Sequence, residues 1–251
     1  MAHSGTGSPD ADVDNGIPAF GRGRFSAPVS NHGSTQNELQ RAGYRLPEYT
    51  ALTEWLVAHG YAVSVPQRPG HGKTGGLYYE WQGSCANADY RRAGLNTAAS
   101  IAAAVDYLIH RPFIRKTGAI AIGQSAGGWG ALALASQNYP PVRAVVAFAP
   151  GGGGRIDGEA NRNCAPDRLV AAARQFGDKT RIPTLWLYAE NDSYFGPELS
   201  KRLADAYRLA GRRAEYHLLP PVGTDGHNMI QSREAAALWA PILEKFLKAG
   251  N

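Results

Sequence analysis

The sequence is short of the features that mark several classes of protein. It has two cysteines and two methionines in 251 residues, and Cys85 and Cys164 form no Cys-x-x-Cys or Cys/His spacing, so we expect no metal site. No apolar run approaches the roughly 18 residues of a membrane helix, so we expect no membrane partner. Residues 1–16 lack the apolar centre of a signal peptide, and no export signal is visible in the sequence as written.

A concentrated basic surface is also missing. Lys and Arg number 26 against 21 Asp and Glu, which gives a net charge of +5, but the basic residues are scattered. The densest groups are the pairs Arg91-Arg92 and Arg212-Arg213, and no nucleic-acid-binding module accompanies them. A scattered basic excess is ordinary for an enzyme surface, so we expect no nucleic-acid partner.

The two cysteines leave two alternatives open. Cys85 and Cys164 could be reduced and unrelated thiols, or they could form one disulfide that ties two loops together. We favour the disulfide because both lie in polar, Gly/Asn-rich loop sequence. A bonded pair would indicate a periplasmic or secreted protein, and reduced thiols a cytoplasmic one.

The chain reads as a flexible tail over residues 1–24 and one α/β domain over residues 25–251. The tail is rich in Gly, Ser, Asp and Pro and has too few large apolar side chains to order itself. After it, strand patterns alternate with helical patterns, which predicts a mostly parallel central sheet with helices on both faces. Strands are predicted at 26–31, 61–66, 118–123, 142–149, 181–190 and 214–220, and helices at 46–60, 95–110, 126–137, 197–211 and 233–249.

The stretch RPGHGKTGG at residues 68–76 raises the question of a phosphate-binding loop. A Walker-type loop needs G-x-x-x-x-G-K-[ST], and Gly72-Lys73-Thr74 supplies only its end, because position 67 is Gln. The sequence that follows has no helical pattern to place a helix N-terminus at a phosphate. We therefore interpret the glycines as a tight loop after the 61–66 strand.

The stretch GQSAGG at residues 123–128 indicates a nucleophile. Ser125 fits G-x-S-x-G and stands between a buried strand and a helix of small residues. A turn this tight strains the serine backbone and exposes its hydroxyl at the C-terminal edge of the sheet, and the flanking glycines avoid clashes. The alternative is that Ser125 is a plain helix cap.

A nucleophilic serine needs a base, and the base needs an orienting acid, which in such sheets follow in the order Ser, acid, His. Asp192 lies just after the 181–190 strand and is our candidate acid, with Glu190 as its rival. His227 lies in the loop after the last strand and is our candidate base. The other histidines, including His71 in the glycine-rich loop, are read as bystanders.

The oxyanion of an acyl-transfer intermediate needs about two N–H donors. One should be the backbone N–H of Ala126, and the second that of Ser34 in the stretch NHGS (31–34) after the first strand. Tyr194 beside the acid and Trp129 beside the nucleophile are candidate walls of a substrate pocket, although each could equally be core packing.

With these motifs assembled, the chain resembles the α/β-hydrolase superfamily and, from about residue 26 onward, its dienelactone-hydrolase-like branch. The resemblance implies ester hydrolysis through an acyl-enzyme, on a small-molecule ester and with no metal or organic cofactor. Two features depart from that branch: a serine replaces the cysteine nucleophile, and the N-terminal edge strands are shortened or missing. The segment 151–163 and the helix after Cys164 are expected to form at most a small cap.

Two other functions are compatible with these motifs. A peptidase of the prolyl-oligopeptidase type shares the triad, but the sequence shows neither a propeller-forming region nor an obvious glutamate pair to hold a peptide amine. A catalytically silent hydrolase fold that serves as a binding module is the other. The substrate's acyl length and the oligomeric state do not follow from the sequence.

Overall fold

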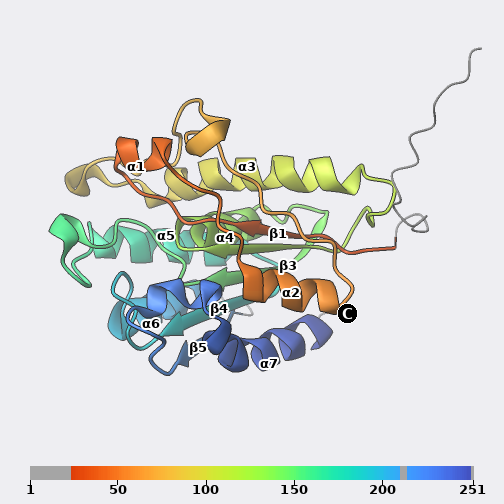
Figure 1. Cartoon of the computed structure of the whole chain (residues 1–251). Helices are drawn as coiled ribbons and strands as arrows, with labels where there is room; N and C mark the ends of the chain where they lie inside the picture. The colour runs from red at the N-terminus through yellow and green to blue at the C-terminus, as the bar shows by residue number, and fades with distance from the viewer. Residues whose placement is uncertain (1–23, 210–213, 250–251) are drawn as a thin grey trace, which may run out of the picture.

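The computed structural model describes residues 24–209 and 214–249, and these residues build a five-stranded parallel sheet (Figure 1). The strands follow the chain in the order β1-β2-β3-β4-β5, and each pairs in parallel with the next. The predicted α/β class is therefore confirmed. The strand bounds are β1 Pro28–Asn31, β2 Ala119–Gln124, β3 Val142–Phe148, β4 Thr184–Ala189 and β5 Ala214–Leu219.

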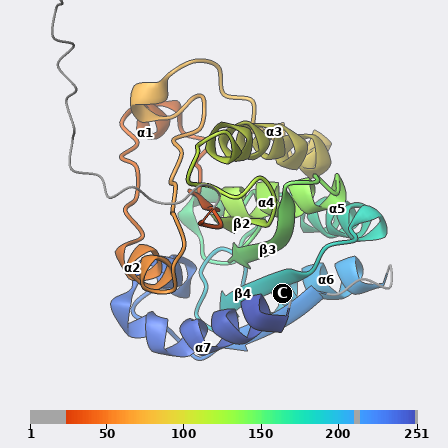
Figure 2. The same ribbon diagram turned by 90° about the vertical axis from the view of Figure 1, so that its right-hand side faces the viewer.

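Helices cover both faces of the sheet, as Figure 2 shows. Helices α3, α4, α5 and α6 pack over one face, and α2 and α7 over the other, so each face encloses its own apolar core. Strands β2, β3 and β4 are buried along their whole length, apart from one half-buried residue in β3, because both faces are covered. The helix bounds are α1 Glu38–Ala42, α2 Thr50–Ala58, α3 Tyr90–Ile109, α4 Ala126–Ser136, α5 Pro166–Lys179, α6 Pro197–Arg208 and α7 Arg233–Ala249.

The predicted strand at 61–66 is wrong as a full strand. The segment runs beside β1 and forms a single parallel bridge, between Ser64 and Val29. Extending the ladder in either direction would need a backbone N–H from Pro28 or from Pro66, and proline has none. The two prolines therefore limit this edge of the sheet to one bridge.

Several helices differ from the sequence reading. Helix α1 was not predicted, and α2 begins at Thr50, four residues later than predicted. Helix α3 begins five residues earlier than predicted, because the Asp89 carboxylate caps it by accepting from the backbone N–H of Arg92. Helix α5, expected as part of a small cap, instead packs beside α3 and α6 and buries Leu169 and Phe176 in the core. The predicted tail lies outside the described residues apart from Arg24, and no described helix is long and apolar enough to span a membrane.

Candidate active site

The turn after β2 holds Ser125 in a strained backbone conformation. Its φ is 54° and its ψ is −121°, a region that residues with a Cβ avoid. The backbone N–H of Ser125 donates to the carbonyl of Phe148 on β3 at 2.9 Å, which fixes the turn at the sheet edge. Helix α4 starts at the next residue. The sharp strand-to-helix turn expected from the sequence is thus present.

Gly123 and Gly127, on either side of this turn, are required by close backbone contacts. A Cβ on Gly123 would lie 2.3 Å from the carbonyl of Gly127, and a Cβ on Gly127 would lie 2.4 Å from the carbonyl oxygens of Asn31 and His32. Side chains do not tolerate such distances. The glycine spacing therefore lets α4 pack directly on β2 and on the loop that follows β1.

Asp192 and His227 form a buried pair at the same edge of the sheet. Asp192 follows β4, and its Oδ1 accepts from the backbone N–H groups of Tyr194 and Phe195 at 2.7 and 2.9 Å. His227 follows β5, and its Nδ1 lies 3.1 Å from Oδ1 and 3.2 Å from Oδ2 of Asp192. Because a carboxylate only accepts, Nδ1 carries a proton, and the neutral form of the ring then has its lone pair on Nε2. The rival acid Glu190 is exposed to solvent.

Gln124 connects this pair to the serine turn. Its Nε2 donates to the backbone carbonyl of His227 at 3.0 Å, and Ser125 is the next residue in the chain. Ser125, Asp192 and His227 are all buried, with exposed fractions of 7%, 1% and 5%. Among the described residues no hydrogen bond joins the Ser125 hydroxyl to the His227 ring, whose Nδ1 contacts Asp192.

The NHGS loop lies against the serine turn. A Cβ added to Gly33 would lie 2.8 Å from Gln124 Oε1 and 3.3 Å from the Ser125 Cβ, so a larger residue here would displace the Gln124 side chain or the loop. Ser34 and Ala126, which the sequence suggested as oxyanion donors, line the same cavity as Ser125. The structure thus brings both predicted donors to one place.

A buried ion pair, which the sequence reading missed, stabilises the NHGS loop through contacts with His32. Arg68 binds Glu80 through two hydrogen bonds of 2.5 and 3.0 Å and donates to the His32 carbonyl at 2.7 Å. The His32 ring donates from Nδ1 to the Gly33 carbonyl and accepts at Nε2 from the backbone N–H of Arg68. Burial, and secondarily the Arg68 charge, lowers the pKa of His32 to about 2, so the ring is neutral.

His71, read from the sequence as a bystander, anchors Ser34. Its Nε2 lies 2.8 Å from the Ser34 hydroxyl, which also contacts the Tyr78 hydroxyl at 3.0 Å. Burial lowers the pKa of His71 from its ordinary value. The RPGHGKTGG stretch therefore supports the NHGS loop through Arg68 and His71, and the short spacing R-x-x-H was its only sequence signal.

Asp225 is a further residue that the sequence reading did not single out. Its carboxylate accepts from the backbone N–H of His227 and from both the N–H and the hydroxyl of Ser193. Burial alone would raise the pKa of Asp225, but these hydrogen bonds outweigh burial and lower it. Its position two residues before His227, typical of a capping aspartate, is a signal that could have found it.

A cavity of about 590 Å³ opens beside Ser125. Both aromatic residues suggested by the sequence line it. Tyr194 stacks on the His227 ring, with 4.1 Å between ring centroids. Trp129 is 2% exposed, packs on Phe176, and its indole N–H is taken by the Tyr90 carbonyl, so it serves as a fixed wall.

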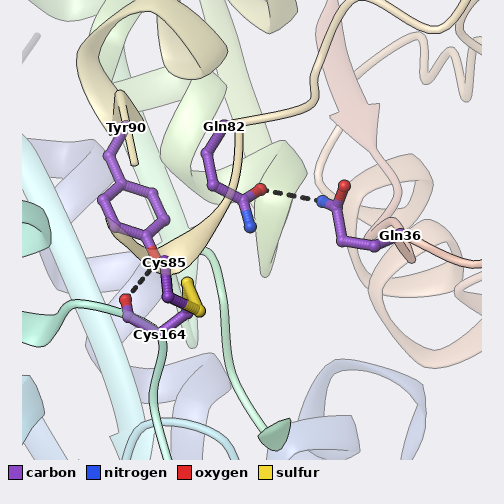
Figure 3. The surroundings of a disulfide bond; sticks show 5 residues. All are labelled: Gln36, Gln82, Cys85, Tyr90 and Cys164. Carbon is purple, nitrogen blue, oxygen red and sulfur yellow. Dashed lines mark hydrogen bonds between the residues drawn. A yellow bond between two sulfur atoms is a disulfide. The ribbon is translucent and has the colours of Figure 1, made fainter. Parts of the chain in front are cut away.

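The predicted disulfide is confirmed, and it lies in the wall of this cavity. Cys85 and Cys164 are bonded, with 5.0 Å between their Cα atoms (Figure 3). The Tyr90 hydroxyl donates to the carbonyl of Cys164 beside the bond. The disulfide thus joins the segment before α3 to the start of α5. The described residues contain no group of three or more His, Cys, Asp or Glu side chains that could hold a metal ion.

A strained serine after β2 and an Asp–His pair after β4 and β5, on a parallel sheet, define the arrangement of a hydrolase fold. The model of the alpha/beta hydrolase family matches residues 32–247. The chain belongs to this family, as the sequence motifs predicted. A comparison with curated protein sequences finds no significant match.

Several solved structures share the fold. The esterase Pf2001 of Pyrococcus furiosus is 18% identical, with a TM-score of 0.61 over 90% of this chain and 84% of that one. A Klebsiella pneumoniae protein described as a dienelactone hydrolase is 18% identical, with a TM-score of 0.58 over 92% and 90%. An acetyl xylan esterase from Paenibacillus sp. R4 is 17% identical, with a TM-score of 0.59 over 92% and 76%. Identities this low establish the fold alone.

Proposed function

We propose that the protein is a serine hydrolase that cleaves carboxylic esters through an acyl-enzyme. The observation that carries the proposal is the Asp192–His227 contact of 3.1 Å at the sheet edge where Ser125 sits in a strained turn. All three residues are buried; Ser125 lines the cavity, and His227 and Asp192 both contact Tyr194, which also lines it. The similar structures named above include an esterase and an acetyl xylan esterase, which supports ester chemistry on this fold.

The proposed chemistry assigns a proton transfer to each step. His227 Nε2 takes the Ser125 proton as the hydroxyl attacks the ester carbonyl, and the resulting imidazolium gives that proton to the leaving alcohol. Water then attacks the acyl-enzyme with His227 again as base, which releases the acid and restores Ser125. Asp192 holds the ring and stabilises its charged form, and it stays ionised throughout.

In the proposed mechanism the backbone N–H groups of Ala126 and Ser34 donate hydrogen bonds to the oxyanion of the tetrahedral intermediate. The N-terminus of α4 also favours negative charge at this point. Because the hydroxyl of Ser34 is held by His71 and Tyr78, its backbone is set before substrate arrives. Such preorganisation is worth roughly 3–4 kcal/mol of barrier for each donor.

Substitution of the nucleophile tests the proposal. Ser125→Ala should reduce hydrolysis of 4-nitrophenyl acetate by about 10⁴-fold or more and abolish labelling by a fluorophosphonate probe. Ser100→Ala on α3 is the matched control and should retain both. Labelling of Ser125 together with faster cleavage of aminoacyl anilides than of esters would instead indicate a peptidase. Absence of labelling in the unaltered protein would indicate a binding module.

We also propose that the protein works in an oxidising compartment. The Cys85–Cys164 bond supports this, since disulfides persist mainly outside the reducing cytosol. Thiol titration of the protein recovered from its native compartment should find no free thiol, and two free thiols per chain would contradict the proposal.

A further inference from the structure

Part of the cavity beside Ser125 has a wall of polar side chains. Amide and hydroxyl side chains from the α1 region and from residues 77–84 face it, among them Gln36, Gln40, Gln82 and Ser84. Among the described lining residues, Ile156 is the only Val, Leu, Ile or Met. Apart from Ala93 and Ala126, the other apolar side chains that line the cavity are aromatic: Tyr78, Trp81, Tyr90, Trp129, Tyr194 and Phe195. A cavity of aromatic rings and amide groups suits a ligand with a ring face and several hydroxyls better than a long flexible acyl chain.

Gln82 is the most constrained of these amides. Its side chain is 5% exposed, and its Oε1 accepts from Gln36 Nε2 at 2.9 Å. This bond fixes the orientation of the amide, and Figure 3 shows the Gln82 nitrogen turned away from Gln36. Among the described residues no hydrogen bond from that Nε2 is found, and the atom is not one of the fully buried atoms without a partner, so it reaches the open space of the cavity that Gln82 lines. A ligand in the cavity can therefore accept a hydrogen bond from it.

The charged groups of the wall are already engaged. The Glu80 carboxylate is bonded to Arg68, and the Arg155 guanidinium donates to the Gly158 carbonyl and lies 4.0 Å from Asp225. The wall therefore offers neutral hydrogen-bonding groups to a ligand. A neutral ligand with several hydroxyl groups matches it better than an anion or a cation.

An aromatic side chain stands at the rim of the same wall. Trp81 is 56% exposed although it is large and apolar, and it lines the cavity next to Gln82 in sequence. An indole face beside amide groups suits a sugar ring, which has an apolar C–H face and a polar edge of hydroxyls. On the other side, Tyr194 lines the cavity beside His227.

We propose that the cavity takes an ester that carries several free hydroxyl groups, namely an acylated neutral sugar, with Gln82 as a hydrogen-bond donor to it and Trp81 as a stacking surface. This inference rests on the ester hydrolysis proposed above and names its substrate class. The Cys85–Cys164 bond lies three residues beyond Gln82 and keeps this polar wall beside the nucleophile.

A matched pair of acetates tests the inference. Methyl 2-O-acetyl-β-xyloside and cyclohexyl acetate are both acetate esters of a secondary alcohol on a six-membered ring, and only the first carries free hydroxyl groups. We expect kcat/KM to be about tenfold or more higher for the xyloside, the effect of one or two net hydrogen bonds. Equal rates, preference for cyclohexyl acetate, or 4-nitrophenyl ester rates that rise steadily from acetate to octanoate would overturn the inference.

Variants assign the effect to the wall. Gln82→Met keeps side-chain length and loses the donor, so the xyloside-to-cyclohexyl ratio should fall about fivefold or more. Gln175→Met, an exposed position on α5, should leave the ratio unchanged. Trp81→Ala should raise KM for the xyloside severalfold, and Tyr107→Ala on α3 is its control. Wild-type ratios in both Gln82→Met and Trp81→Ala would overturn the inference.

A separate readout keeps this result distinct from the hydrolase proposal. Fluorophosphonate labelling counts the active sites in every preparation, so a variant that fails to fold is recognised. If Gln82→Met fails to fold, the result for Trp81→Ala, at an exposed position, tests the inference instead. Cleavage of 4-nitrophenyl acetate with no cleavage of the xyloside overturns the sugar-ester inference alone. Absence of both labelling and 4-nitrophenyl acetate cleavage overturns the proposed function and the inference with it.

Discussion

The Ser193 hydroxyl donates to Asp225 Oδ2 at 2.6 Å, and this bond joins the loop that carries Asp192 to the loop that carries His227. Asp225 also accepts from the backbone N–H groups of Ser193 and His227. The Asp192–His227 contact is therefore supported from outside by a second carboxylate, which contacts neither ring nitrogen. We regard Asp225 as a positioning residue.

Asp225→Asn should weaken catalysis more than substrate binding. The amide cannot accept all three hydrogen bonds in the same geometry, so the His227 loop shifts relative to Asp192. We expect kcat for 4-nitrophenyl acetate to fall about 10- to 100-fold, with KM little changed. The measurement is a kcat and KM pair normalised to active sites counted by fluorophosphonate. Asp178→Asn, exposed on α5, is the control, and an equal loss there would contradict the assignment.

The buried His32 should make the protein sensitive to acid. Its pKa is lowered to about 2 in the folded state against 6.5 ordinarily, so between these values the unfolded chain binds a proton that the folded chain does not. Stability is therefore greatest above pH 6.5 and falls as the pH is lowered, by up to about 1.4 kcal/mol per pH unit for this group.

Urea unfolding at pH 7.5, 6.0 and 5.0 measures this slope. His32→Gln should reduce the loss of unfolding free energy between pH 7.5 and 5.0, because the titrating group is gone. His110→Gln, at an exposed position after α3, should keep the wild-type slope. If the His32→Gln slope matches the wild type, the burial of a neutral His32 is not the cause.

Loss of the disulfide should destabilise the fold. The bond closes a loop with a sequence separation of 79, for which the chain-entropy model gives about 4.5 kcal/mol and measured values are typically about 2–4. Cys85→Ser with Cys164→Ser should lower the urea midpoint accordingly. Adding reductant to the wild type should lower the midpoint toward that of the double variant and leave the variant unchanged. A wild-type midpoint in the double variant would contradict the prediction.

Gly127→Ala should be among the most damaging small substitutions in the chain. The added methyl would lie 2.4 Å from the carbonyl oxygens of Asn31 and His32, so α4 must move away from the NHGS loop. We expect a loss of about 3 kcal/mol or more in unfolding free energy, together with loss of activity. Gly43→Ala, where the nearest atom is at 3.6 Å, should be almost neutral. Similar stabilities for both variants would refute this account.

Five of the strand segments, and the location of Ser125, Asp192 and His227 in the segments that follow three of them, could be predicted from the sequence. Periodicity located β2 to β5 within a few residues, because both-face burial demands continuous apolar runs. It failed at 61–66, where the apolar pattern is present but Pro28 and Pro66 remove the N–H groups that a ladder needs. The apolar pattern reports burial and does not report hydrogen-bond capacity.

The supporting residues of the site could not be predicted. Arg68 and Glu80 are twelve positions apart on an irregular segment, and only the folded chain shows that they pair beneath the NHGS loop. The same is true of His71 and Ser34, which come from separate loops. Motif spacing identifies residues whose positions are set by a strand end, and it cannot place side chains that irregular segments bring together.

The tight contact of Gly127 with residues 31 and 32 has a mechanical consequence. Because no space separates the two backbones, the hydroxyl and the Ser34 amide that the proposed mechanism uses would move as one rigid unit. Under that mechanism, adjustment to substrates of different shape falls to residues 77–84, and the disulfide at the adjacent Cys85 restricts their movement.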